Sequence, residues 1–345
     1  SFGAGVAGYL STSVLRENII QDNELWDPVG GSGGGLSFML SQPLIENNLI
    51  TRNHAEQGSG IYADYSTPFI AGNVIEDNSM YVTPLTIGNG LLTEYGAVYC
   101  WLCPDFTIER NILRNNTAVK GAGVIVLSSF QGRIESNLFD NNDASDWSGA
   151  AGWGGGLYVE VPLDAEGDIR ILNNTFVNNT AEDQGGAIAM NLWSDAIVVA
   201  SNIMAFNSSG MWQYPYLQGN VRVLEYNNLF NTGDNYINLS PGLTDTQLDP
   251  LFNDYDLEDY SLSSASPCIE SGSESELPAS HLDLNNAIRI QDGDESGFSR
   301  IDKGAYEYPG PHGVHVNPAS GLVTSESGLT DYFEVYLTRE PLAPV

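Results

Sequence analysis

Two acidic residues fall at the same position of neighbouring repeats. Six glycine phrases in the chain are each followed by a short apolar stretch, and these stretches begin at Leu36, Ile61, Leu91, Val124, Leu157 and Ile188. Alternate side chains of a strand share a face, so the second and fourth positions face outward if the first and third are buried. The fourth position then carries Asp64 and Glu94 in adjacent repeats, and Glu160 further along. The alignment therefore predicts an outward acidic face.

The predicted pairing of Asp64 with Glu94 would allow two kinds of chemistry. Neighbouring strands lie about 5 Å apart, and two carboxylates at that distance raise each other's pKa. Retaining glycosidases use a pair of carboxylates at about this spacing. Carboxylate oxygens are also preferred ligands of calcium. Asp64 and Glu94 are therefore candidates for catalysis and for calcium binding, and the alternative is a solvated acidic face without a ligand.

Aromatic residues gather on the same outward face and in the loops before the glycine phrases. Those that we take as candidates for ligand binding, together with Glu160, are Tyr62, Tyr158, Trp26, Trp147, Trp153 and Trp212. Corresponding loops of a repeat emerge at one corner, so we expect the tryptophans to line one edge. Exposed aromatic surfaces often mark binding sites, and their faces stack on sugar rings. The alternative is that these rings cover the edge of the fold and fill gaps between loops.

The cysteines and basic residues give weaker signals. Cys100 and Cys103 form one Cys-x-x-Cys without a second pair, which favours a local disulfide over a zinc site. We expect Cys268 to be buried and unpaired. The one local group of basic residues comprises Lys120, Arg110, Arg114 and Arg133. We expect it to form ion pairs with Glu109 and Glu135 rather than to bind substrate.

A repeated asparagine phrase predicts the elements that position these residues. Its copies begin at Asn18, Asn48, Asn73, Asn111, Asn137, Asn174, Asn202 and Asn228. Seven copies carry a second Asn five positions later, and all but the last have an aliphatic residue three positions before the first Asn; Glu225 stands there in the last. The apolar runs are short, contain β-branched and aromatic residues, and end at Gly, Asn, Asp or Pro, which indicates strands rather than helices.

A repeat of about 25 residues with two or three strands is typical of a coil of a parallel β-helix. We therefore predict an all-β solenoid whose aliphatic residues stack inward from coil to coil. Asn fits the corners, because it tolerates the left-handed conformation and its amide bonds the backbone. On stacked corners such residues can form a ladder.

These motifs resemble the right-handed parallel β-helix repeat proteins secreted by bacteria, the pectate-lyase-like superfamily in its broad sense. The resemblance covers residues 1–308. The run Asp249-Pro250-Leu251-Phe252 and the phrase that ends at Tyr306-Glu307 resemble the closing segment of this group, here about residues 240–308. The resemblance implies a secreted or surface-anchored protein. Some proteins with this fold are polysaccharide lyases, hydrolases or epimerases, but none of their catalytic motifs matches, so the resemblance supplies no catalytic residue.

The composition changes after residue 308. Residues 309–313 read as a Pro/Gly linker, and residues 314–345 contain alternating segments typical of a β-sandwich. Residues 320–326 resemble the opening of bacterial immunoglobulin-like or Calx-β-like repeats. So short a segment cannot form an independent sandwich core. We expect it to be cut from a longer protein, and the alternative is that its strands dock on the β-helix.

The net charge of −32, from 44 acidic and 12 basic residues, restricts the partners. Such a surface disfavours nucleic acid and anionic membranes, because it cannot replace phosphate counterions. No apolar stretch is long enough for a transmembrane helix. Calcium-rich or saline surroundings would suit the many carboxylates, so calcium is a conceivable cofactor.

The sequence favours a structural or adhesive protein of the cell surface or extracellular space. We expect it to bind a glycan or another surface protein through an aromatic edge and an acidic face. One alternative is a polysaccharide-active enzyme, a hydrolase more than a lyase. Another is a filament subunit, because open β-helix ends expose strand edges that can stack end to end.

Overall fold

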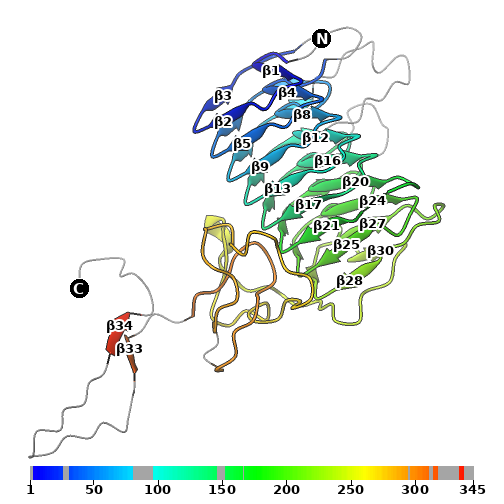
Figure 1. Ribbon diagram of the computed structural model, residues 1–345. Coiled ribbons are helices and arrows are strands. Elements are labelled where there is room, and N and C mark those ends of the chain that lie inside the picture. The colour runs from blue at the N-terminus through cyan, green and yellow to red at the C-terminus, as the bar shows by residue number, and fades with distance from the viewer. Residues whose placement is uncertain are drawn as a thin grey trace, which may run out of the picture.

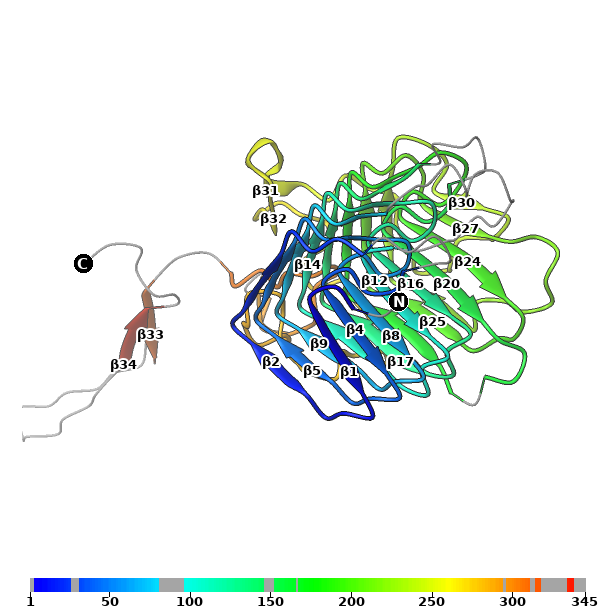
Figure 2. The ribbon, with the colours of Figure 1, turned by 90° about the horizontal axis from the view of Figure 1, so that it is seen from above.

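The computed structural model describes residues 3–25, 31–80, 96–145, 152–165, 167–293 and 296–310, and the backbone alone of 314–317 and 334–337. The chain winds into a parallel β-helix, so that each coil adds one strand to each of several sheets (Figure 1). Seen from above, the strands of successive coils form parallel rows (Figure 2). The predicted all-β parallel solenoid is confirmed.

Three long sheets and one short sheet run along the β-helix. The first contains β1 (Val6–Tyr9), β4 (Leu36–Met39), β8 (Ile61–Asp64), β12 (Val98–Trp101), β16 (Val124–Leu127), β20 (Leu157–Val161), β24 (Ile188–Leu192), β27 (Met211–Gln213) and β30 (Tyr236–Ile237). The second contains β2 (Val14–Arg16), β5 (Leu44–Glu46), β9 (Phe69–Ala71), β13 (Thr107–Glu109), β17 (Gly132–Glu135), β21 (Ile169–Leu172), β25 (Ile197–Ala200) and β28 (Val223–Glu225).

The third sheet contains β3 (Ile19–Gln21), β6 (Leu49–Thr51), β10 (Val74–Glu76), β14 (Ile112–Arg114), β18 (Leu138–Asp140), β22 (Thr175–Val177), β26 (Ile203–Ala205) and β29 (Asn228–Phe230). The short sheet contains β7 (His54–Ala55), β11 (Ser79–Met80), β15 (Thr117–Ala118), β19 (Asp143–Ala144) and β23 (Thr180–Ala181). Two antiparallel pairs follow, β31 (Phe252–Asp254) with β32 (Asp259–Leu262) around the 3-10 turn η1 (Tyr255–Leu257), and β33 (Val314–Asn317) with β34 (Glu334–Leu337).

Columns of aliphatic side chains form the core. The inward residues of the second sheet stack from Ile45 through Ile70 and Ile108 to Ile134, all fully buried and paired in register. In the third sheet the rings of Phe139 and Phe176 stack with centroids 4.5 Å apart. Each buried aliphatic side chain contributes roughly 1.5–3 kcal/mol to stability, so the stacked columns fix the register of the coils.

The asparagine ladders are confirmed. The Nδ2 atom of Asn73 donates to Oδ1 of Asn111 at 2.9 Å and to the carbonyl of Ile45 at 2.9 Å, and equivalent bonds join the first Asn of each described coil. Asn78 bonds Asn116 in a second ladder. These amides satisfy backbone groups that would otherwise be buried without partners at the corners.

The structure corrects where the left-handed residues lie. The residue before each Asn of the first ladder, rather than the Asn itself, has positive φ, as at Asn47 (55°), Arg110 (52°) and Ser136 (57°). The last copy is also shifted by one residue, because Asn202 bonds Asn227 and not Asn228. Leu224 then precedes the ladder Asn by three positions and faces the core, which removes the exception at Glu225.

One glycine phrase was assigned wrongly. The strand that pairs with β8 is Val98–Trp101, which follows Gly96-Ala97, and not the stretch at Leu91. The phrase Gly88-Asn89-Gly90-Leu91 has the same internal order of glycines and apolar residue as the other phrases, but it lies outside the described residues. All alignment positions taken from it are therefore replaced, with Tyr99, Cys100 and Trp101 in the second, third and fourth places.

The expected disulfide between Cys100 and Cys103 is not formed, and Cys268 is also a free, buried thiol. Cys100 faces the core between Ala63 and Val126, while the backbone of Cys103 donates to Ser129 Oγ at 3.2 Å. Cys103 thus continues a corner row of small polar residues that includes Ser41 and Ser66. Both cysteines fill small buried positions, as free cysteine commonly does.

The closing segment packs against the outside of the β-helix and runs back along it (Figure 1). Its contacts with the left-handed corner residues extend from Tyr226 back to Arg110, although Asp302 meets this corner out of chain order: Thr244 with Tyr226, Ser273 with Ser201, Asp302 with Asn173, Leu282 with Ser136 and Asn286 with Arg110. Tyr260, Phe252 and Leu284 cover outward residues of the third sheet. The predicted division of the chain at residues 308 and 313 stays a prediction.

Candidate binding surface

The outward fourth position of the first sheet differs from the sequence alignment at one decisive place. In register, this row reads Tyr9, Met39, Asp64, Trp101, Leu127, Glu160 and Asn191. Asp64 is thus flanked by Met39 and Trp101, and the predicted pairing of Asp64 with Glu94 is wrong in this row. Glu94 lies outside the described residues. The row is more aromatic and less acidic than the sequence indicated.

Asp64 is buried within this row. The residue is 6% exposed, and its Oδ1 atom has no hydrogen-bond partner among the described residues. Burial raises the pKa of this carboxyl above its ordinary value. A buried carboxylate oxygen without a donor is costly, so a ligand hydroxyl or amide that donated to it would gain a favourable contact.

A row of left-handed corner residues adjoins the fourth position. It consists of Leu10, Leu40, Tyr65, Leu102 and Ser128. The first four bond the next coil through their backbone N–H groups. We call Tyr9, Leu10, Leu40, Tyr65 and Trp101 the aromatic strip. Tyr9 is 64% exposed, Tyr65 50% and Trp101 38%, and the rings of Tyr65 and Trp101 lie 6.3 Å apart. Exposed apolar groups on successive coils form one contiguous surface, which is typical of interaction sites.

This strip could not be seen in an alignment of the glycine phrases that ends at the fourth position. Apolar residues at the fifth position, Leu40 and Tyr65, were a visible signal, since a corner residue has no structural need for a large ring. Trp101 could have been placed by counting to the next ladder Asn. Ile61 precedes Asn73 by 12 positions and Val98 precedes Asn111 by 13, whereas Leu91 precedes Asn111 by 20.

The aromatic side chains predicted to bind ligand lie elsewhere. Tyr62 and Tyr158 are 2% and 1% exposed, so the prediction that they face solvent is wrong. They belong to a second apolar layer on the outside of the first sheet, with Tyr99, Ile125 and Trp212. The rings of Trp153 and Trp212 stack with centroids 5.5 Å apart, and Lys120 Nζ lies 4.6 Å from the ring of Trp153. These rings cover the sheet, as the alternative interpretation held.

The structure describes only some of the other residues that were predicted to bind a ligand. Trp26 and Trp147 lie outside the described residues. Glu160 is half-buried and accepts a bond from Ser128 Oγ at 3.4 Å. Tyr214 contacts Trp212 and extends the aromatic cluster to the exposed ring of Tyr216. Binding by Glu160 or by this cluster stays a prediction.

Ion pairing accounts for much of the basic group. Arg110 bonds Glu109 at 2.7 Å, as expected, while Arg114 bonds Glu76 on the preceding coil at 2.7 Å. Within the described ranges, no three His, Cys, Asp or Glu side chains are grouped so as to hold a metal ion. The proposed use of Asp64 with Glu94 for catalysis or calcium binding therefore loses its geometric basis, and calcium binding stays a prediction.

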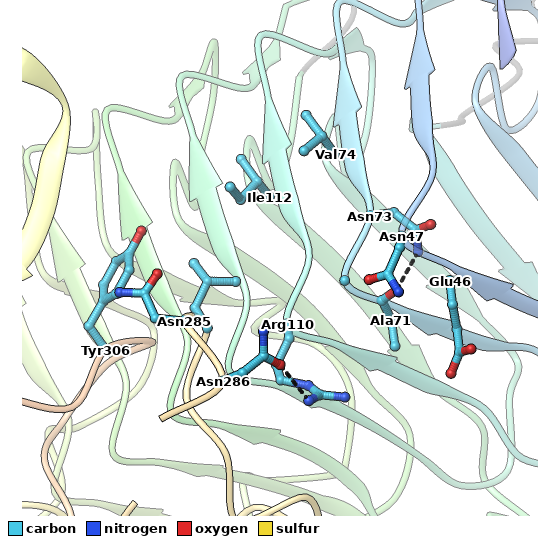
Figure 3. A pocket seen from close by; sticks show the side chains of 12 residues that line it. Glu46, Asn47, Ala71, Asn73, Val74, Arg110, Ile112, Asn285, Asn286 and Tyr306 are labelled. Carbon is cyan, nitrogen blue, oxygen red and sulfur yellow. Dashed lines mark hydrogen bonds between the residues drawn. The ribbon is translucent and has the colours of Figure 1, made fainter. Parts of the chain in front are cut away.

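A separate pocket of about 360 Å³ lies between the β-helix and the part of the closing segment around Asn285 and Asn286. Figure 3 shows Val74 and Ile112 side by side, with Arg110 and Asn286 meeting below them, Tyr306 and Asn285 at one side and Glu46 at the other. Arg110 Nη1 donates to Asn286 Oδ1 at 3.0 Å. The pocket therefore combines an apolar floor with a polar rim.

Comparisons with known proteins agree with this architecture. The family pattern described as the right-handed β-helix region matches residues 1–129, and that of the Chlamydia polymorphic membrane protein repeat matches residues 175–190. No curated protein and no solved structure matches the chain. No helix among the described residues is long and apolar enough to cross a membrane. The chain thus folds as a right-handed parallel β-helix, with a short stretch similar to the Chlamydia polymorphic membrane protein repeat.

Proposed function

We propose that this protein is a β-helix scaffold of the cell surface or extracellular space that binds a glycan through its aromatic strip. Surface location is supported by the similarity of residues 175–190 to a membrane-protein repeat and by the strongly acidic composition. The observation that carries the binding proposal is the exposure of Tyr65 and Trp101 beside the buried carboxylate of Asp64, with exposed Tyr9 two coils away in the same row.

The geometry of the strip fits an extended saccharide. Coils rise by about 4.8 Å, so rings on successive coils offer repeated stacking surfaces along the solenoid. Aromatic side chains provide a large apolar contact area, which suits the C–H face of a sugar ring. Asp64 Oδ1 would accept a hydrogen bond from a sugar hydroxyl. A single carboxylate of this kind orients a ligand, whereas hydrolysis would need a second acid–base group.

A glycan array with and without EDTA tests the proposal. We expect binding to a limited set of glycans by the wild-type chain and strongly reduced signals for Trp101→Ala. Trp193→Ala is the matched control, because Trp193 is also an exposed tryptophan but lies on another coil, after β24. Absence of binding to any glycan in both conditions would contradict the proposal. A difference between the two conditions would show whether calcium participates.

A protein partner is the second candidate for the same strip. Leu10 and Leu40 are exposed beside the rings, and aliphatic side chains of this kind are more useful in protein interfaces than in sugar sites. If the array is negative while Leu40→Asp abolishes adhesion of the protein to cells, the strip binds protein. The enzyme and filament alternatives stay predictions.

A further inference from the structure

The pocket beside the closing segment arises from one missing side chain. The left-handed corner residues before the first ladder Asn are Glu17, Asn47, Gly72, Arg110, Ser136, Asn173, Ser201 and Tyr226. Gly72, with φ of 65°, is the one glycine of this column. The column therefore carries no side chain of its own between Asn47 and Arg110, although Asn47 Oδ1 lies 2.4 Å from where a Cβ of Gly72 would stand.

The closing segment contacts this column of corner residues only on the C-terminal side of Gly72. Its contacts with the corner extend from Tyr226 through Ser136 to Arg110, whose Nη1 donates to Asn286. The next position along its path is Gly72, where Asn285, Asn286 and Tyr306 form one wall of the pocket. The cavity is thus enclosed by two parts of the chain that are far apart in sequence.

Arg110 has an unused donor at this place. Its Nη2 bonds Glu109 at 2.7 Å and its Nη1 bonds Asn286 at 3.0 Å, so the guanidinium is held from two sides. Its Nε is buried and has no hydrogen-bond partner among the described residues. A buried donor without an acceptor costs about 1–3 kcal/mol, and a ligand oxygen at this point would remove that cost.

The charges around the pocket favour a neutral ligand. The carboxylate of Glu46 is bonded to Arg16 at 2.6 Å, and the charge of Arg110 is balanced by Glu109. The chain carries a net charge of −32, so an anion would be repelled. The floor of Val74 and Ile112 is apolar, whereas Asn47, Asn285 and Asn286 offer amides.

We infer that this pocket binds one neutral sugar residue, at a site separate from the aromatic strip. The C–H face of the ring would lie on Val74 and Ile112, and its hydroxyls would meet Arg110 Nε and the asparagine amides. The volume of about 360 Å³ lies at the lower end of the range of small-molecule sites. A bound sugar would also join the closing segment to the β-helix, since both parts contribute to the pocket.

Saturation-transfer NMR with free hexoses and N-acetylhexosamines tests this inference, with glucuronate as the anionic probe. The full chain would carry Trp101→Ala, so that binding at the strip does not contribute. We expect saturation transfer to at least one neutral sugar and none to glucuronate. Transfer to no neutral sugar, or stronger transfer to glucuronate, would overturn the inference.

Gly72→Asn in the same background closes the pocket without an unfavourable backbone. Asn occupies the equivalent left-handed corner at Asn47 and Asn173, so the backbone can keep its conformation while the exposed Asn47 side chain turns away. We expect at least a tenfold loss of affinity with an unchanged unfolding midpoint. Glu17→Asn is the control, because it introduces the same residue at an equivalent corner two coils away, and it should bind as its parent does. Equal affinity of a folded Gly72→Asn protein would overturn the inference.

Discussion

Trp101 lies directly beside Asp64 in the parallel pairing of β12 with β8, and its ring contacts that of Tyr65. This relationship joins an exposed aromatic surface to a buried carboxylate within one row of the β-helix. It replaces the pair of carboxylates that the sequence alignment predicted, and it removes the geometric basis for hydrolysis by that pair.

Asp64→Asn should separate binding from stability. The unpartnered Oδ1 of Asp64 destabilises the ligand-free protein, so we expect the neutral amide to leave the free energy of unfolding unchanged or to raise it by about 1 kcal/mol. Glycan affinity should fall, because the acceptor that a hydroxyl needs is weakened. Urea unfolding and titration of a glycan identified on the array measure the two quantities. A loss of stability without a loss of affinity would contradict a ligand role for Asp64.

Asn137→Ala should break the first ladder at its centre. Asn137 is fully buried, donates to Ile108 and Asn174, and accepts from Asn111. Its removal leaves several buried backbone and amide groups unpaired, and we expect a loss of about 3 kcal/mol in the free energy of unfolding.

Asn115→Gly is the control for this ladder prediction. Asn115 is exposed and has φ of 55°, which glycine adopts readily, so the change should stay within about 0.5 kcal/mol. If urea unfolding gives similar losses for both variants, the ladder does not hold the corner as described.

The thiols should all be free and protected. A hydrogen bond with the Cys103 thiol, together with burial, raises the pKa of Cys100, and burial raises the pKa of Cys268 to about 12. We expect no alkylation of the native protein at neutral pH, because the thiolate is the reactive form. After unfolding without a reductant, mass spectrometry should show three labels. One label that becomes three only after reduction would show that the disulfide exists.

The closing segment should loosen as pH rises. Burial raises the pKa of Asp302 to about 7 and that of Glu307 to about 8, from ordinary values of 3.8 and 4.5. Between the ordinary and the raised pKa of each group, the folded protein binds more protons than the unfolded chain. The stability that these two protonated carboxyls contribute therefore falls as pH rises. Urea unfolding should therefore show lower stability at pH of about 8.5 than at pH of about 5.5.

The double variant Asp302→Asn, Glu307→Gln tests the assignment of this pH dependence. It keeps similar shapes at both sites but removes both titrating groups, so the difference between the two pH values should shrink. A full difference in the double variant would mean that other carboxylates cause it.

The fold could be predicted because its signals repeat. The aliphatic residue before each asparagine phrase and the ladder Asn recur in every coil, so a single misplacement, such as Asn228 for Asn227, left the architecture intact. Trp101 was misplaced because two glycine phrases competed in one long coil, and only the count to the next ladder Asn distinguishes them. One choice of register decided whether Glu94 or Trp101 stood beside Asp64.

The pocket and the burial of Tyr62 and Tyr158 depend on contacts that no repeat encodes. The closing segment carries no copy of the asparagine phrase, and its path along the corner is set by individual bonds such as that of Asn286 to Arg110. The second apolar layer outside the first sheet breaks the rule that an outward side chain meets solvent. Strand alternation predicts the direction in which a side chain points. Whether other residues cover that side chain depends on tertiary packing.

The most direct test is calorimetric titration of an array-selected glycan into three proteins. These are the wild-type chain, the double variant with Tyr65→Ala and Trp101→Ala, and the control Trp193→Ala. Loss of one stacking contact is worth about 1.4 kcal/mol or more, so the double variant should bind at least about tenfold more weakly while the control is unchanged. Wild-type affinity in a folded double variant would show that the aromatic strip is not the binding surface.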